Sequence, residues 1–168
     1  MEDQELEAIF EIFRKAAISG DSQAQSCLSY AYSRGLGVKA NNMKAFQWSK
    51  ISAENGNSIG QLNLAFHFKE GQGVTQDDKQ AVKWYMEASK QGNAHAQNNL
   101  AFMFSKGRGV DQNYKKAIFW YEQAAINGYE TAKENLAKLQ AKNASPSLSF
   151  QSWIETKPTG EKVQMCMI

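Results

Sequence analysis

Few side chains in this sequence could carry out chemistry, and their spacing argues against it. The only histidines, His67 and His95, have no cysteine or acidic partner at the spacing of a metal site. The only cysteines, Cys27 and Cys166, are too few for a disulfide framework and wrongly spaced for zinc. We therefore predict no metal site and two free thiols.

Three Gly-x-Gly pairs raise the question of nucleotide binding, because a glycine-rich turn before a helix can hold phosphate groups. The third glycine of that motif is missing, with Ala40, Gln76 and Gln112 in its place, and we expect no strand before any copy. Asp77 and Asp78 fall at a predicted helix start, where carboxylates cap amides and favour the helix dipole. Nothing suggests a catalytic triad. The sequence thus predicts no cofactor, no catalytic residue and no enzyme.

The composition is that of a soluble globular protein, with 42% hydrophobic and 21% charged residues. No segment approaches the roughly 18 consecutive apolar residues that a membrane span needs, and the acidic first residues do not resemble a secretory signal. The net charge is +2, and the lysines are scattered rather than clustered. We expect a cytoplasmic protein that binds neither membranes nor nucleic acids.

One pattern of glycines, alanines and tryptophan occurs three times, 36 residues apart. The copies are GLGVKANNMKAFQWSKISAENG, GQGVTQDDKQAVKWYMEASKQG and GRGVDQNYKKAIFWYEQAAING. Boundary glycines, a small residue, a leucine, the Gly-x-Gly pair and a tryptophan stay in register. They are Gly20, Gly56, Gly92 and Gly128; Ala24, Gly60, Ala96 and Ala132; Leu28, Leu64, Leu100 and Leu136; Gly35/Gly37, Gly71/Gly73 and Gly107/Gly109; Trp48, Trp84 and Trp120.

Each 36-residue unit is predicted to form two helices, the first over 21–34 and the second over 42–55 in the first unit. Ala24, Leu28 and Tyr32 share one face of the first helix, which should be the core face. A polar N-cap former precedes every second helix: Asn41, Asp77 and Asn113. The Gly-x-Gly pairs supply the positive φ of a tight turn. The tryptophans are predicted to be buried, filling the space beside the small residues.

The predicted solenoid spans 1–142. It has a lone second helix at 4–18, repeats at 20–55, 56–91 and 92–127, and a half repeat at 128–142, which makes eight helices with atypical ends that act as caps. Residues 143–168 depart from the period. Their Ser/Pro start and apolar residues leave three interpretations open: a cap on the last helix, a segment in the groove, or a disordered tail.

The units resemble the Sel-one-like repeat, a relative of the tetratricopeptide repeat. The shared motif is A-x-x-x-L-[GA]-x-x-Y-x-x-G-x-G-V followed by A-x-x-W-[YS]-x-x-[AS], over residues 20–128. This resemblance implies an all-α fold, a right-handed α/α superhelix of antiparallel helix pairs. Ser29, Phe68, Phe104 and Ser49 depart from the motif, which affects local packing only.

A solenoid of helix pairs offers a concave groove lined by the first helix of each unit. Residues opposite the core face should point into it. In this groove Tyr30, Phe66 and Phe102 form either an aromatic binding stripe or contacts between successive helices, and the sequence leaves both open. The predicted partner-binding residues are Tyr30, Arg34, Ile59, Leu62, Phe66, Lys69, His95, Asn98, Phe102 and Lys106.

The sequence therefore predicts a non-enzymatic adaptor, a monomer or weak dimer that holds a protein or peptide partner in its groove. Family members are commonly scaffolds, and some similar small proteins are bacterial immunity proteins that neutralise a toxin, so the resemblance implies either role. The alternative is a small-molecule-binding protein or hydrolase of the β-lactamase-like branch of the family. That branch is cysteine-rich and secreted, unlike this chain.

Overall fold

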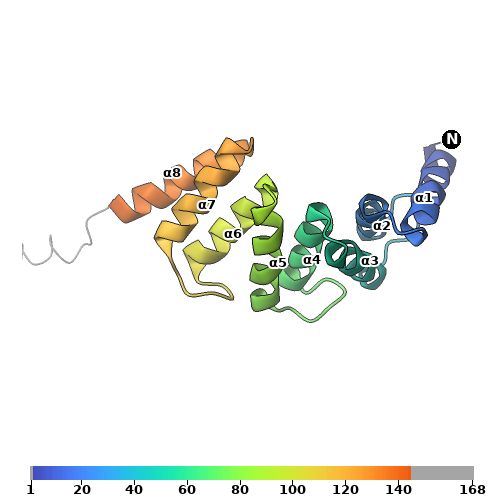
Figure 1. Cartoon of the computed structure of the whole chain (residues 1–168), viewed down its shortest axis with the longest axis horizontal. Coiled ribbons are helices and arrows are strands. Elements are labelled where there is room, and N and C mark those ends of the chain that lie inside the picture. Colours follow the sequence, from blue (N-terminus) through green and yellow to red (C-terminus); the bar gives the residue numbers. More distant parts are fainter. Residues whose placement is uncertain (1, 145–168) are drawn as a thin grey trace, which may run out of the picture.

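The computed structural model describes residues 2–144, and this part of the chain forms eight helices and no strand. Figure 1 shows them following one another in chain order along the long axis of the molecule. Of the predicted tail, residues 145–168 lie outside the described part. The helices are α1 (Glu2–Ile18), α2 (Ser22–Arg34), α3 (Asn42–Glu54), α4 (Ser58–Glu70), α5 (Asp78–Lys90), α6 (Ala94–Lys106), α7 (Tyr114–Ile126) and α8 (Glu130–Ala144).

The helix boundaries follow from short polar side chains and glycines. The predicted N-caps are confirmed, since Asn41, Asp77 and Asn113 each accept a hydrogen bond from a backbone amide of the first turn. Asp21, Asn57 and Asn93 cap the first helices in the same way, which the sequence analysis did not single out. The first glycine of each Gly-x-Gly pair ends the first helix in the left-handed region, as at Gly35 with φ 73°.

The second glycine of each pair has a role beyond its positive φ. Gly37, Gly73 and Gly109 lie against the helix of the preceding unit, and an added Cβ would overlap the carbonyl of Leu6, Asn42 or Asp78 respectively. Asn42 and Asp78 are the first residues of α3 and α5. The glycine therefore permits the close approach of one unit's turn to the preceding unit's second helix.

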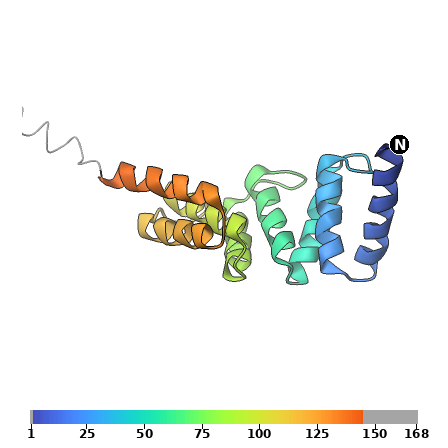
Figure 2. The same ribbon diagram turned by 90° about the horizontal axis from the view of Figure 1, so that it is seen from above.

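Helix pairs stack in series, and Figure 2 shows from above how they follow one another along the array. α2 packs against α3, and α3 in turn packs against α4, so the second helix of one unit contacts the first helix of the next. The predicted core face is confirmed, since Ala24, Leu28 and Tyr32 are buried. Leu64 and Leu100 are buried at the corresponding places. The buried apolar residues form two clusters, one from α1, α2 and α3 and the other from α4 to α8.

The tryptophans are less buried than predicted. Trp48, Trp84 and Trp120 are only partly buried and pack against the edge of the core. The deeply buried rings are Tyr85 and Tyr121, the residues that follow two of these tryptophans. The helical period places both neighbours near the core but leaves open which one points into it, and the packing of adjacent helices selects the tyrosine.

A buried glutamine in each unit ties three consecutive helices together, and we call this arrangement the glutamine clamp. The side-chain amides of Gln25, Gln61 and Gln97 donate to the carbonyls of Ala17, Ala53 and Ser89 in the preceding helix, over 3.1, 3.4 and 3.1 Å. Their side-chain oxygens accept from Asn55, Gln91 and Asn127 after the following helix, over 2.9, 2.8 and 2.9 Å. The clamp recurs in all three units.

The two ends of the array differ. The last helix, α8, exposes charged side chains such as Lys133, Glu134 and Lys138, as a capping helix should. α1 exposes Ile9, Ile12 and Phe13. α1 also exposes charged side chains such as Glu11 and Arg14, so both ends have polar surface and the α1 end adds exposed apolar side chains.

Substitution of Gly73 by alanine tests the contact between units. Gly73 (φ 74°) and Gly92 (φ 81°) both have positive φ, but a Cβ at Gly92 meets nothing within 4 Å. Backbone strain alone should lower the free energy of unfolding by about 1 kcal/mol in Gly92→Ala. Gly73→Ala should lower it by a further ~1–3 kcal/mol, because the Cβ overlaps Asn42. Urea denaturation measures both, and equal losses would contradict this interpretation.

Gln97→Glu tests the glutamine clamp, because it keeps the shape but replaces the donating amide with a carboxylate that faces the Ser89 carbonyl. We expect a loss of more than about 2 kcal/mol in the free energy of unfolding at neutral pH, since a buried carboxylate would lack its partner. The loss should shrink in acid, where a protonated carboxyl can donate. The control is Gln47→Glu at an exposed position on α3, expected to stay within about 0.5 kcal/mol.

Candidate binding groove

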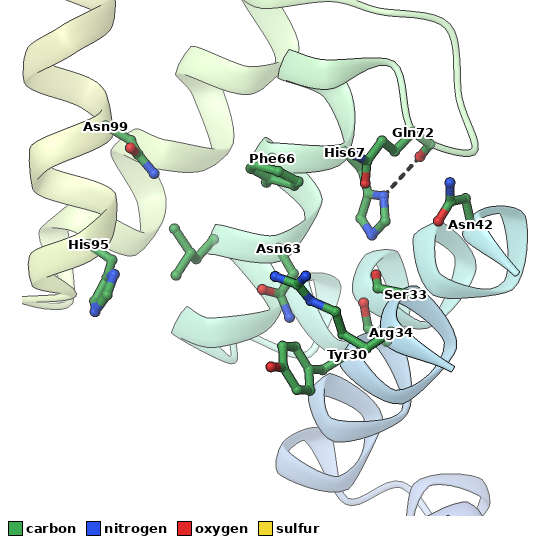
Figure 3. Close-up of a pocket in the computed structure, with 12 residues that line it drawn as sticks. Tyr30, Ser33, Arg34, Asn42, Asn63, Phe66, His67, Gln72, His95 and Asn99 are labelled. Carbon is green, nitrogen blue, oxygen red and sulfur yellow. Dashed lines mark hydrogen bonds between the residues drawn. The ribbon is translucent and has the colours of Figure 1, made fainter. Parts of the chain in front are cut away.

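A pocket of about 510 Å³ opens on the side of the array formed by α2, α4 and α6. Figure 3 shows side chains from these three helices around one space. α2 and α4 pack against each other there more extensively than α4 and α6 do. The lining residues are Ser29, Tyr30, Ser33, Arg34, Asn42, Leu62, Asn63, Phe66, His67, Gln72, His95 and Asn99.

Five of the ten predicted groove residues line this pocket: Tyr30, Arg34, Leu62, Phe66 and His95. The rings of Tyr30 and Phe66 are 54% and 40% exposed. The Arg34 guanidinium lies 5.8 Å from the centre of the Tyr30 ring, within the range of a cation–π contact. The structure therefore brings together the predicted residues Tyr30 and Arg34 of α2, Leu62 and Phe66 of α4, and His95 of α6.

The other predicted residues are placed outside the pocket lining. Ile59 is exposed near the start of α4, and Lys106 is exposed at the end of α6. The Lys69 ammonium lies 2.9 Å from the Glu70 carboxylate and 5.5 Å from the centre of the Phe66 ring. Its charge is therefore partly neutralised.

Asn98 and Phe102 do not present free groove surfaces. Asn98 is buried, and its side-chain oxygen accepts a hydrogen bond of 2.9 Å from Asn135 on α8. Phe102 is partly buried and packs against the core. The aromatic row thus divides, with two exposed rings at Tyr30 and Phe66 and one partly buried, packing ring at Phe102.

His67 is a buried titratable side chain to which the sequence assigns no function. Only 2% of its surface is exposed, and its Nδ1 lies 2.8 Å from the Gln72 carbonyl oxygen, the dashed contact in Figure 3. A carbonyl only accepts, so Nδ1 carries the proton, and in the neutral ring Nε2 is an acceptor. Burial lowers the pKa of His67. The sequence did contain a sign that this residue is unusual. The equivalent residues of the other two units, Ala31 and Met103, are apolar.

The pocket lining is polar and holds no carboxylate. Among its twelve residues the only permanent charge is Arg34, for which the described part of the chain provides no ion-pair partner. Asn42, Asn63 and Asn99 add side-chain amides, each able to donate and accept. His95 lies against Tyr129, with ring centres 4.5 Å apart. These groups suit hydrogen bonding and ring contacts to a neutral or acidic ligand and disfavour a cation.

The comparison with known proteins agrees with this architecture. The Sel1 repeat model matches residues 22–57, 58–93 and 94–129. The chain belongs to the Sel1 repeat family. These boundaries start two residues after those set by the boundary glycines, because each family repeat begins with the first helix itself.

Solved Sel1 repeat structures share the fold. A Sel1 repeat protein from Oxalobacter formigenes is 31% identical, with a TM-score of 0.69 over 80% of this chain and 58% of its own. A protective antigen of uropathogenic Escherichia coli that displays an SLR fold is 36% identical, with a TM-score of 0.73 over 77% of this chain and 28% of its own. Cysteine-rich protein B of Helicobacter pylori, at 24% identity and a TM-score of 0.64 over 81% of this chain and 98% of its own, shows the fold alone.

This Sel1 repeat chain spans little more than half of the Oxalobacter protein and about a quarter of the Escherichia coli antigen. No curated protein matches it. Proteins built from Sel1 repeats generally mediate protein–protein interactions as non-enzymatic scaffolds. Within residues 2–144 no helix is long and apolar enough to cross a bilayer. The same residues contain no cluster of three or more potential metal-binding side chains.

The buried His67 should make stability pH-dependent. Its pKa in the folded Sel1 repeat array is below the ordinary 6.5, so the unfolded chain binds more protons between these two values. The free energy of unfolding should therefore fall as the pH falls below about 6.5, and level off below the folded pKa. In His67→Met, which copies Met103, this contribution should be absent. Urea denaturation between about pH 7.5 and pH 5.5 measures it, and identical slopes would contradict the assignment.

Proposed function

We propose that this protein is a non-enzymatic adaptor that binds a segment of a protein partner in the groove of α2, α4 and α6. The observation that carries the proposal is the pocket in this groove, where two half-exposed rings, Tyr30 and Phe66, flank Arg34, a cation with no ion-pair partner in the described residues. Exposed aromatic and arginine side chains in a concave site are the groups that concentrate binding energy at interfaces.

The asparagines support an extended segment as the bound form. Asn63 and Asn99 occupy the same place in adjacent units and both line the pocket. A side-chain amide can pair with the backbone N–H and C=O of an extended segment, so two amides at the same place in adjacent units suit a segment that crosses from one unit to the next.

The sequence raised two narrower hypotheses, an immunity protein and a hydrolase, and the groove bears on them differently. An immunity protein that neutralises a toxin is one kind of adaptor, and the groove adds no feature specific to it. The hydrolase alternative needs a general base held by a third group. The pocket contains serines and histidines but no aspartate or glutamate. Binding is therefore the function we propose, and the cytoplasmic location and the monomeric or weakly dimeric state remain predictions.

The test uses the full chain as bait in the cell from which it comes, followed by affinity measurement with the purified partner. Tyr30→Glu and Phe66→Glu should each weaken binding by about 30-fold or more, the loss of an interface hot spot of ~2 kcal/mol. A carboxylate replaces the ring and also pairs with Arg34. Circular dichroism and thermal melting should show an unchanged fold, because both side chains are exposed.

Phe119→Glu is the matched control, since Phe119 is a half-exposed phenylalanine on α7 outside the pocket. Its affinity for the partner should stay within about twofold of the unmodified chain. If the two groove variants bind as tightly as this control, the partner does not occupy the groove and the proposal is wrong.

A further inference from the structure

The first unit lacks a tyrosine that the other two units bury. Tyr85 and Tyr121 are almost fully buried in the core, and the residue at the same place in the first unit is Ser49. Ser49 is also fully buried, and its hydroxyl donates to the Phe46 carbonyl over 2.8 Å. Ser49 itself does not line the pocket, but a serine is too short to reach where a tyrosine hydroxyl would lie.

The residues around the tyrosine hydroxyls have first-unit counterparts in the pocket lining. The charges of Glu70, Asp78 and Arg108 act on the Tyr85 hydroxyl. Their counterparts one unit earlier are Arg34, Asn42 and Gln72, and all three line the pocket. The Tyr121 hydroxyl lies beside Ser105, whose first-unit counterpart, Ser33, also lines it. The repeat symmetry thus maps the tyrosine positions of the other units onto this pocket.

Two buried polar groups at this pocket have unused hydrogen-bonding capacity. The Ser29 hydroxyl has no partner in the described chain, although only 1% of the residue is exposed. Alanines occupy its place in the second and third units, at Ala65 and Ala101. The structure assigns no partner to His67 Nε2 within residues 2–144, while Nδ1 bonds to Gln72. A buried hydroxyl without a partner is unfavourable, so a ligand that pairs with the Ser29 hydroxyl is favoured, and His67 Nε2 can accept from the same ligand.

The rim of the pocket suits an aromatic ring. Leu62, Phe66 and Tyr30 provide apolar and aromatic surface around the opening. Arg34 already lies over one ring, and its planar guanidinium can stack on a second. The site therefore combines a ring-binding rim with a hydrogen-bonding interior.

We propose that the pocket takes a tyrosine side chain of the partner, which enters from the groove and places its hydroxyl where the hydroxyls of Tyr85 and Tyr121 lie in the other units. This inference rests on the proposed binding function and names its anchor. The phenol hydroxyl donates to His67 Nε2 and accepts from the Ser29 hydroxyl. Its ring lies among Leu62, Phe66 and Tyr30.

Other side chains match the site less well. A phenylalanine fits the rim but leaves Ser29 and His67 unpaired. A carboxylate would meet Arg34, but it cannot donate to the Nε2 of neutral His67. A lysine would bring a second cation beside Arg34 into a site without a carboxylate. A phenol alone provides a ring together with one donor and one acceptor at its end.

The test needs no knowledge of the partner. N-acetyl-L-tyrosinamide and N-acetyl-L-phenylalaninamide are titrated into the full chain, and the NMR signals of the His67 ring and the backbone are followed. The tyrosine amide should bind with a Kd on the order of millimolar and shift the His67 signals. The phenylalanine amide should bind about five- to tenfold more weakly, the effect of one hydrogen-bonded group. Equal binding, or shifts away from the pocket, would overturn the proposal.

Ser49→Tyr supplies the missing ring from within the chain. It should keep or raise the melting temperature, because the other units carry tyrosine at this place, and it should weaken tyrosine amide binding at least about tenfold. Gln47→Tyr adds a tyrosine at an exposed position of the same helix and should leave binding unchanged. Full binding by a folded Ser49→Tyr variant would refute the mapping of the pocket onto the tyrosine place.

The double variant Ser29→Ala/His67→Met keeps the test decisive if Ser49→Tyr does not fold. Both new residues occur at the same places in other units, at Ala65 and Met103. The variant should bind the two amides equally, because the hydrogen-bonding groups are gone while the rim remains. A retained preference for tyrosine would contradict the assigned hydrogen bonds. The adaptor function is tested separately, by the loss of partner binding expected in Phe66→Glu.

Discussion

The contact between each helix pair and the one before it is the constraint on which the rest of the structure depends. A 13-residue helix such as α2 is marginal alone in water, so it persists only by packing against its neighbours. Two devices hold the neighbours in place. A glycine without a Cβ lets each turn rest on the start of the preceding second helix, as Gly73 does on Asn42. The glutamine clamp joins three helices through one buried side chain, as Gln61 does between Ala53 and Gln91. Both devices recur every 36 residues, which keeps successive units in the same relative position.

Regular stacking also explains how a binding site can arise from a small change in sequence. When each unit repeats the same contacts, a residue that breaks the pattern leaves its neighbours in position and changes only the local space. Ser49 in place of a buried tyrosine, Ser29 in place of alanine and His67 in place of alanine or methionine all fall in or beside the same region of α2, α3 and α4. The pocket opens there, with polar groups that the other units lack. Departures from the repeat motif thus mark the place where this array differs chemically from a uniform scaffold.

Under the proposed function, the groove is the recognition site. Its exposed rings and its single arginine can bind through area and charge, and its asparagines can pair with a peptide backbone. Lys69 and Asn98 engage other residues of the array, with Glu70 and Asn135 respectively. Asn98 therefore joins α6 to α8, and the Lys69 charge is partly neutralised within α4, so neither offers a free group to a partner. The surface available for binding is accordingly concentrated on α2 and α4, nearer the α1 end of the array.

The sequence by itself determined the helices, their N-caps at Asn41, Asp77 and Asn113, the positive-φ turns and the core face that contains Leu28, because these depend on local geometry and on a period that repeats three times. The tertiary structure alone decided which residue of each Trp–Tyr pair is buried, that Phe102 packs while Phe66 is exposed, and that Asn98 bonds to α8. It also decided the pairing of His67 with Gln72 and the role of the second glycine. The physical reason is that helical periodicity fixes the direction of a side chain about its own axis. The depth, partners and free space of that side chain depend on how closely neighbouring helices approach.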